Sequence, residues 1–191
     1  MISSSATANF AENGTGTVLD VDAASEGVIT YSISGGADAA KFAIDAATGV
    51  LTFVAAPDFE TPTDAGANNV YDVQVTASTA SSGTAVQSLA VTVTAVNDND
   101  PVITTATTAS FAENATGTVI DVNATDADLP AQTLTFSITG GADAARFAIN
   151  ATTGVVTFVS SPNFEAPTDA GADNVYDVQV TASDGTRTVN Q

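Results

Sequence analysis

Residues 70–76 read Val-Tyr-Asp-Val-Gln-Val-Thr, a stretch in which apolar and polar side chains alternate. This period of two is typical of a β-strand with one buried face, and it places Val73 and Val75 on the same face as Tyr71. The later run Leu89-Ala-Val91-Thr-Val93 alternates in the same way. We therefore expect two strands whose apolar faces point into a core.

The sequence around this stretch occurs twice. Phe10-Ala-Glu-Asn13 returns as Phe111-Ala-Glu-Asn114, and residues 31–78 align with residues 136–183. Over the aligned segments 10–24 and 31–78, 48 of 63 positions are identical in the two copies. The chain is therefore one domain duplicated, with four extra residues in the second copy between the two aligned segments.

Short alternating runs bounded by Gly, Pro, Asn and Asp predict an all-β fold with seven strands in the first copy. We expect these strands near residues 5–11, 17–22, 28–34, 42–45, 50–54, 70–78 and 85–95, and one helical turn at 37–41. The expected domains are residues 1–96 and 102–191, joined by a linker at 97–101. The second copy reaches only to Gln191, about where its last strand would begin, so we expect that strand to be missing. Either a fragment boundary or a strand donated by a neighbouring chain would account for this.

The charge balance excludes several classes of partner. The chain has 22 Asp and Glu against 3 Lys and Arg, a formal net charge of −19. Nucleic acids and anionic membranes require basic residues, so we expect neither as a partner. There is no Cys and no His, which removes thiolate and imidazole chemistry, and no apolar run is long enough to insert into a membrane. Such an acidic chain either repels itself or holds cations.

The junction between the copies reads Asn97-Asp-Asn-Asp-Pro101. Side-chain and carbonyl oxygens in such a run suit a hard cation, although Asn-Asp runs are more often solvated turns. Pro101 favours an extended backbone. Asp58 and Glu60 are two residues apart on an extended segment, so they point the same way; this suits shared metal ligation better than an acid/base pair, and we expect no enzyme activity. We expect Tyr31, Tyr71, Phe53 and Phe59 to be core residues and not a sugar-binding platform.

Six short motifs in order resemble those of the cadherin-type repeat, and they cover nearly the whole chain. They are Ala11-Glu-Asn13, Phe42-Ala-Ile-Asp-Ala-Ala-Thr-Gly49, Pro57-Asp-Phe-Glu60, Asn97-Asp-Asn-Asp-Pro101, Asp126-Ala-Asp128 and Ala182-Ser-Asp-Gly185. The long loop at 61–66, its counterpart at 166–171 and the Lys-poor composition resemble the bacterial cadherin-like tandem repeats of large secreted or surface adhesins. The resemblance implies tandem immunoglobulin-like Greek-key β-sandwiches.

The resemblance also implies a set of calcium ligands at the linker, with about three Ca²⁺ ions. The first copy would supply Glu12, Asp58 and Glu60, and the second copy Asp126, Asp128 and Asp184. The linker itself would bind through the side chains of Asn97 and Asp98 and through the carbonyls of Val96 and Asn99. Three Ca²⁺ ions would offset all but one of the seven negative charges in this set, which would otherwise repel one another. Such a linker would be rigid with calcium and would make the two repeats a rod.

The other ends of the two copies are poorer in carboxylates. Ser25 and Thr79 stand where the second copy has Asp126 and Asp184, so the first copy lacks these ligands at its entry end. At the exit end of the second copy, Glu113 and Glu165 remain but Asn163 replaces Asp58, which predicts at most a weak, partial cation site. Any calcium dependence should therefore belong to the 95–101 junction.

The sequence predicts a calcium-binding, extracellular spacer or adhesion module that is part of a larger secreted or surface-anchored protein. Its partners would be calcium and neighbouring repeats of the same chain. One alternative is a module that binds polysaccharide or a second copy of itself, although no cluster of aromatic residues supports sugar binding. Another is a metal-independent acidic sandwich adapted to high salt.

Overall fold

The computed structural model describes residues 1–80 and 83–191. Within them the chain forms two compact units, Met1–Val96 (unit 1) and Asn97–Gln191 (unit 2), which we describe separately. The described part of each unit is built of β-strands plus one short 3-10 turn. The predicted all-β class is confirmed. No described helix has the length and apolar character required to cross a bilayer.

Unit 1 contains seven described strands and the 3-10 turn η1 (Ala39–Lys41). The strands are β1 (Thr7–Ala11), β2 (Thr17–Asp20), β3 (Ile29–Gly35), β4 (Phe42–Ile44), β5 (Val50–Phe53), β6 (Val70–Thr79) and β7 (Gly83–Thr94). All seven lie within or close to the ranges expected from the sequence, and η1 falls in the expected helical turn.

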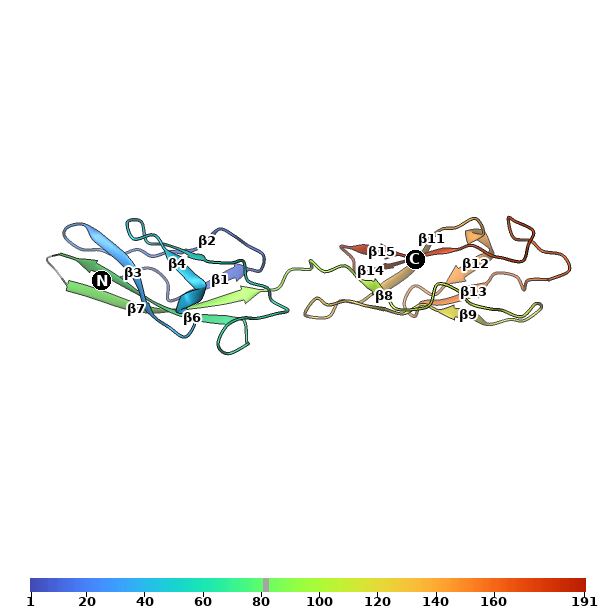
Figure 1. The fold of residues 1–191 in the computed structure, drawn as a ribbon, viewed down its shortest axis with the longest axis horizontal. Coiled ribbons are helices and arrows are strands. Elements are labelled where there is room, and N and C mark those ends of the chain that lie inside the picture. The colour runs from blue at the N-terminus through green and yellow to red at the C-terminus, as the bar shows by residue number, and fades with distance from the viewer. Residues whose placement is uncertain (81–82) are drawn as a thin grey trace. The chain divides into compact units, whose positions relative to one another are not determined.

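The strands of unit 1 form two sheets (Figure 1). One has the order β1-β7-β6-β3 and the other β2-β5-β4. β7 runs antiparallel to β6 and parallel to β1, so the last strand lies between the first strand and β6. The chain crosses from one sheet to the other between β3 and β4 and again between β5 and β6, as in a sandwich.

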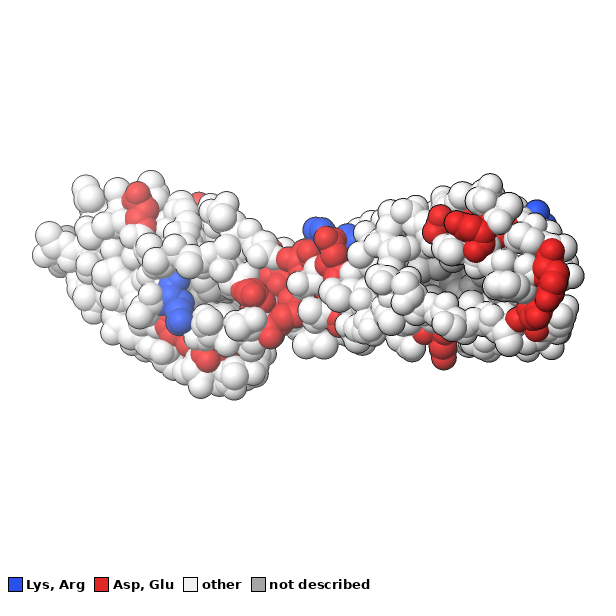
Figure 2. Space-filling view, turned by 45° about the vertical axis from the view of Figure 1, so that its right-hand side comes forward, with Lys and Arg blue, Asp and Glu red and all other residues white. Residues whose placement is uncertain are grey.

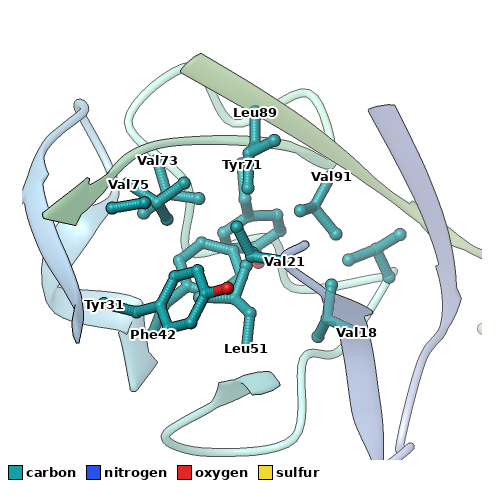
Figure 3. Close-up of a cluster of buried hydrophobic side chains, with 12 residues drawn as sticks. Val18, Val21, Tyr31, Phe42, Leu51, Tyr71, Val73, Val75, Leu89 and Val91 are labelled. Atoms are coloured by element: carbon teal, nitrogen blue, oxygen red, sulfur yellow. The ribbon is translucent and has the colours of Figure 1, made fainter. Parts of the chain in front are cut away.

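The alternation in residues 70–76 is what places β6 in the core of unit 1. Tyr71, Val73 and Val75 are at most 1% exposed, and they face Val91, Leu89 and Gln87 of β7. Figure 3 shows these side chains pointing toward residues such as Leu51 and Phe42 of the opposite sheet. Tyr31 is also buried, and Phe53 and Phe59 pack against the same cluster, so the prediction that these aromatic residues are core residues is confirmed.

Unit 2 repeats this plan with shorter strands. It contains β8 (Val102–Ile103), β9 (Thr118–Asp121), β10 (Ala124–Thr125), β11 (Thr135–Gly140), η2 (Ala144–Arg146), β12 (Phe147–Ile149), β13 (Val155–Phe158), β14 (Gln179–Ser183) and β15 (Thr188–Asn190). The sheets have the orders β11-β14-β15, β12-β13-β9 and β10-β8. β14 has five residues where β6 has ten, and residues 108–112, the counterpart of β1, form no strand.

The second copy contains the beginning of its last strand, which corrects the sequence-based expectation that this strand is missing. β15 pairs antiparallel with β14, with Thr188 opposite Ser183 and Asn190 opposite Thr181. Gln191 continues the ladder through two backbone hydrogen bonds of 2.9 Å with Val180. β14 is held on one side by β11, and β15 pairs with its other side.

The long loop that precedes β6 is held by a buried carboxylate. Asp64 is 6% exposed and accepts hydrogen bonds from the backbone N–H groups of Gly66, Asn68 and Asn69. In unit 2, Asp169 holds the corresponding loop, accepting from the N–H groups of Asp173 and Asn174 at 2.9 and 3.1 Å. Burying an acid is tolerated here because its oxygens are hydrogen-bonded.

Candidate metal centre

Three aspartates of unit 2 gather at one end of the sandwich. Asp126 and Asp128 follow the short strand β10, and Asp184 follows β14 directly. Each offers a carboxylate oxygen within 4.8 Å of those of the other two. The N–H of Asp128 donates to Asp126 Oδ1 at 3.0 Å, which folds this Asp-Ala-Asp segment into a turn. The repeat motif thus places three carboxylates within the span of one ion.

Asp128 is tied to the segment that enters unit 2. It is 1% exposed, and its Oδ1 accepts hydrogen bonds from the side-chain Nδ2 of Asn99 at 2.7 Å and the backbone N–H of Asn99 at 3.1 Å. The N–H of Asp98 donates to the same oxygen at 3.3 Å. Asn99 Nδ2 also reaches Asp98 Oδ1 at 3.2 Å. These contacts hold the 97–100 segment against the aspartate cluster.

Asp184 is fixed by the turn that connects β14 to β15. Its Oδ1 accepts hydrogen bonds of 2.6 Å from the N–H groups of both Thr186 and Arg187. Gly185, which directly follows Asp184, has φ of 100°, a conformation that glycine adopts without strain. The Oδ1 atom of Asp184 is therefore bound within this turn, and its Oδ2 atom remains available to a different partner.

Two of these carboxyl groups have lowered pKa values. For Asp128, burial raises the pKa, but the hydrogen bonds from Asn99 and Asp98 outweigh burial and lower it overall. For Asp184, the Arg187 N–H lowers the pKa most, burial opposes it, and the Thr186 N–H lowers it further. Both groups are therefore ionised at neutral pH and present negative charge to the cluster.

Three buried oxygen atoms in this cluster accept no hydrogen bond from any residue that the structure describes. They are Asn97 Oδ1, Asp126 Oδ2 and Asp184 Oδ2. An unpaired buried oxygen is costly, and here two of the three belong to carboxylates. All three are hard oxygen acceptors, the donor type that Ca²⁺ prefers. The residues of unit 2 therefore fit a calcium ion.

Unit 1 presents carboxylates of its own at the end of β1. Glu12, 3% exposed, accepts the N–H of Val96 on Oε1 at 2.6 Å and the N–H of Phe59 on Oε2 at 2.7 Å. A carboxylate oxygen of Glu60 lies within 4.8 Å of one of Glu12. Glu12 thus anchors the last residue of unit 1 while keeping a negative charge at this end.

Asp58 and the predicted ligands at the exit end of unit 2 accept local hydrogen bonds and belong to neither described group of three acidic residues. Asp58 is exposed, and its Oδ1 accepts the N–H of Thr61 at 2.9 Å in a local turn. At the corresponding end of unit 2, the exposed Glu113 accepts the N–H of Phe164 at 3.1 Å, and Asn163 accepts the N–H of Glu165 at 3.0 Å.

Arg187 is a functional candidate that the sequence reasoning did not identify. Its Nη1 lies 3.0 Å from Asp100 Oδ1, and both side chains are partly exposed. The hydrogen bond to Asp100 raises the pKa of Arg187, burial opposes this, and the charges of Asp98 and Asp128 raise it further. One of three basic residues in the chain thus lies beside the acidic cluster. On the face drawn in Figure 2, acidic side chains form patches and basic side chains are few.

The opposite end of unit 1 carries different chemistry. The counterparts of Asp126 and Asp184 are Ser25 and Thr79, which line a small cavity of about 70 Å³ together with residues such as Met1, Ala77 and Ala85. Among the residues that the structure describes, no acidic side chain lines this cavity. The two units therefore share a sandwich but differ at this end, as the sequence predicted.

Comparisons with known proteins show which kind of domain the chain contains. A family model of the cadherin domain matches residues 107–191. Protocadherin Fat 4 of Homo sapiens is 36% identical over 153 residues, which cover 76% of this chain and 3% of that protein. Halomucin of Haloquadratum walsbyi is 39% identical over 77 residues, which cover 39% of this chain and 1% of that protein. A crystal structure of human protocadherin-24 EC1-2 has a TM-score of 0.74 at 22% identity, covering 97% of this chain and 88% of that one.

The fold defines the class as a tandem β-sandwich module of the cadherin type. The chain carries cadherin-type repeats, and residues 107–191 are a cadherin domain. Cadherin domains are adhesion modules of the extracellular space, not enzymes, and they typically depend on calcium. The chain spans only 3% and 1% of the length of the two relatives named above.

Proposed function

We propose that this chain is a calcium-dependent spacer segment of an extracellular surface adhesin, with calcium bound where the first repeat passes into the second. The observation that carries the proposal is the set of three unpaired buried oxygens among Asn97, Asp126 and Asp184. They lie in a cluster of ionised carboxylates that no described basic side chain enters apart from the partly exposed Arg187. A divalent cation would satisfy these oxygens and offset their charge.

The proposal includes the ligands that unit 1 would contribute. Glu12, Asp58 and Glu60 would complete the coordination together with Asp98 and the carbonyls of Val96 and Asn99, for about three ions in all. Support comes from the charge of Glu12 and Glu60 at the end of unit 1 and from the direct covalent link between Val96 and Asn97. A joint bridged in this way would be stiff with calcium and mobile without it. Affinities of extracellular calcium modules, about 10⁻⁴–10⁻³ M, would suit such a joint.

Calorimetric titration with Ca²⁺ tests the binding, with Asp184→Asn as the variant and Asp121→Asn as its matched control. Both changes remove one negative charge, but Asp121 is an exposed residue of β9 outside the cluster. We expect Asp184→Asn to weaken calcium binding at least tenfold and Asp121→Asn to leave it within about twofold, because one liganding carboxylate contributes far more than a distant charge. Equal effects of the two variants would show diffuse binding to an acidic surface. An absence of binding would favour a salt-adapted sandwich.

Small-angle scattering tests the mechanical part of the proposal separately. We expect chelation with EDTA to broaden the distribution of end-to-end distances and Ca²⁺ to restore a narrow one. Asp126→Asn should leave the distribution broad even with calcium. Calcium binding without any change in this distribution would retain the metal site but contradict its role in stiffening the joint.

A further inference from the structure

Phe59 of unit 1 is held through both of its backbone groups. Its N–H donates to Glu12 Oε2 at 2.7 Å, and its C=O accepts a hydrogen bond from the side-chain Nδ2 of Asn69 at 2.9 Å. Phe59 lies between Asp58 and Glu60, two of the calcium ligands named in the proposed function. Because a peptide unit is planar, the first bond fixes the peptide before Phe59, and the second fixes the peptide between Phe59 and Glu60. Asn69 therefore sets the direction in which the backbone enters Glu60.

Asn69 makes this contact from a fixed conformation. Its φ is 62°, in the left-handed region that asparagine tolerates better than most residues. Its N–H donates to Oδ1 of the buried Asp64 at 3.1 Å, and its C=O accepts the N–H of Val93 in β7 at 2.8 Å. Both backbone groups of Asn69 are thus bound, and a rigid part of the loop presents its side chain to Phe59.

A second buried carboxylate holds the same loop. Asp38 is 4% exposed, and its Oδ1 accepts the N–H of Ala65 at 2.7 Å while its Oδ2 accepts the N–H of Asp72 at 2.9 Å. Asp38 thus ties the middle of the loop to the start of β6, and Asp64 ties the loop to Asn69. A side chain that positions a site acts most accurately from a backbone fixed in this way.

The amide oxygen of Asn69 shows which end of this side chain is used. Oδ1 is buried and accepts no hydrogen bond from any residue that the structure describes. An unpaired buried oxygen is destabilising, and a glycine would adopt the same φ without one. The contribution of this side chain is therefore the bond from Nδ2 to the carbonyl of Phe59.

This bond belongs to a continuous chain of hydrogen bonds within unit 1. Asp64 binds the N–H of Asn69, Asn69 Nδ2 binds Phe59, the N–H of Phe59 binds Glu12, and Glu12 Oε1 accepts the N–H of Val96 at 2.6 Å. The chain thus links the loop before β6 to the carboxylate at the end of β1. It ends at Val96, whose carbonyl is one of the ligands in the proposed function.

We propose that Asn69 is a positioning residue of the calcium site, whose Nδ2 group orients the Phe59–Glu60 peptide and thereby the carboxylates of Glu12 and Glu60. This inference rests on the proposed function, because it assigns Asn69 to the unit 1 half of that site. Asn69 itself is not a ligand. Hydrogen-bond partners that orient metal ligands contribute about 10–100-fold to metal affinity. Loss of the Asn69 amide should therefore weaken calcium binding although every ligand remains.

Asn69→Gly tests the proposal because glycine keeps the left-handed backbone and removes only the amide. Calorimetric titration should show calcium binding about tenfold weaker than in the original chain. A purely structural hydrogen bond would lower the stability of unit 1 in EDTA but would leave the calcium affinity of the folded chain unchanged.

Asn174→Gly is the matched control. Asn174 has φ of 65° and donates to the carbonyl of Phe164 at 3.1 Å, but in unit 2 the N–H of Phe164 leads to the exposed Glu113. None of these residues belongs to the ligand set of the proposed function. The control should therefore leave calcium affinity within about twofold of the original.

Asn69→Asp separates position from charge. Aspartate has nearly the same shape and also tolerates a left-handed backbone, but at about pH 8 its ionised carboxylate cannot donate to the Phe59 carbonyl. An added negative charge alone would tighten the binding of Ca²⁺. Loss of the donor should instead weaken it about tenfold, as in Asn69→Gly. The two explanations therefore predict changes of opposite sign.

Hydrogen exchange in EDTA tests the positioning without calcium. Asn69→Gly should speed the exchange of the Phe59 and Val96 amides, both bound to Glu12, about tenfold, and Asn174→Gly should not. Equal calcium affinity of the original and Asn69→Gly chains, tighter binding by Asn69→Asp, or unchanged exchange of both amides would overturn the proposal. An original chain that binds no calcium would overturn the proposed function instead, and the exchange in EDTA would still decide whether Asn69 positions Glu12.

Discussion

Replacing Glu12 by Ala should destabilise unit 1 even when no calcium is present. The Glu12 carboxylate is 3% exposed and accepts hydrogen bonds from the N–H groups of Val96 and Phe59 at 2.6 and 2.7 Å. Leaving a buried donor unpaired costs about 1–3 kcal/mol. Val96 is partly exposed, so water can partly replace the hydrogen bond of its N–H group when Glu12 is removed. Phe59 is half-buried, so its N–H group is less accessible to water. We expect a total loss of about 3 kcal/mol, a large share of the stability of an ordinary domain.

The duplicated domain supplies a matched control in Glu113→Ala. Glu113 occupies the equivalent position, but it is exposed and accepts one bond, from the N–H of Phe164 at 3.1 Å. Its loss should change the stability of unit 2 by no more than about 0.5 kcal/mol, the usual range for a surface substitution. Glu12→Gln should fall between the two, because the amide oxygen still accepts one N–H while the amide NH₂ faces the other donor.

Urea unfolding in EDTA, monitored by far-UV circular dichroism, measures these differences in stability. The shift in the urea midpoint gives the change in the free energy of unfolding when the dependence of that free energy on urea concentration is the same for all variants. Calorimetry of the same variants shows which of the two units has lost stability. A Glu12→Ala effect below about 1 kcal/mol, or one equal to that of Glu113→Ala, would refute the reasoning. The two N–H groups would then be satisfied by water, and Glu12 would matter only as a calcium ligand.

Three further outcomes can be measured on the same material. Burial raises the pKa of Asp169, but hydrogen bonds from backbone N–H groups outweigh burial and lower this pKa overall. Ionised Asp169 therefore stabilises the folded unit at pH values above about 3.9, the pKa of the carboxyl group in the unfolded chain. This stabilisation is lost as the pH falls below that value. In Asp169→Asn, the melting temperature should therefore depend less steeply on pH in the acid range than in the original chain. Arg187→Gln removes a cation from beside the cluster and should raise calcium affinity about threefold at low salt, with the difference vanishing in 0.5 M NaCl by calorimetry. Tyr71→Phe should cost about 1 kcal/mol in urea unfolding because the buried hydroxyl accepts the N–H of Thr63 at 3.2 Å, whereas Tyr176→Phe should cost almost nothing.

Strand positions could be predicted from the sequence because a strand with one buried face requires alternating apolar and polar residues. The alternation around Tyr71 survives in the structure as alternating buried and exposed residues along β6. The end of unit 2 was less predictable. Residues 108–112 and 174–178 have nearly the same sequences as β1 and the first half of β6, yet they form no strand. Their unit 1 counterparts are strands because β7 lies between them and hydrogen-bonds to both, so the local sequence alone could not decide the outcome.

The candidate site shows a similar division. The resemblance to cadherin-type repeats predicted Asp126, Asp128 and Asp184 as ligands of one site, and the structure brings their carboxylate oxygens within 4.8 Å of one another. Arg187 was not predicted, since nothing in a turn sequence tells that the third residue after Asp184 reaches Asp100. The exposed turn position of Asp58 was also not evident from its motif. Side-chain reach across loops depends on the packed structure, not on motif spacing.

The difference between the two units shows that the acidic cluster and the fold are separable in this domain. Both cores are built of apolar and aromatic residues. The centroid distances of matched aromatic pairs in the two units agree within 0.1 Å. The positions of Asp126 and Asp184 are nevertheless occupied by Ser25 and Thr79 in unit 1, with no loss of the sandwich. These positions follow the ends of strands, where a side chain changes the surface without touching the core. A repeat of this kind can therefore gain or lose its acidic cluster by a few substitutions and keep its sandwich.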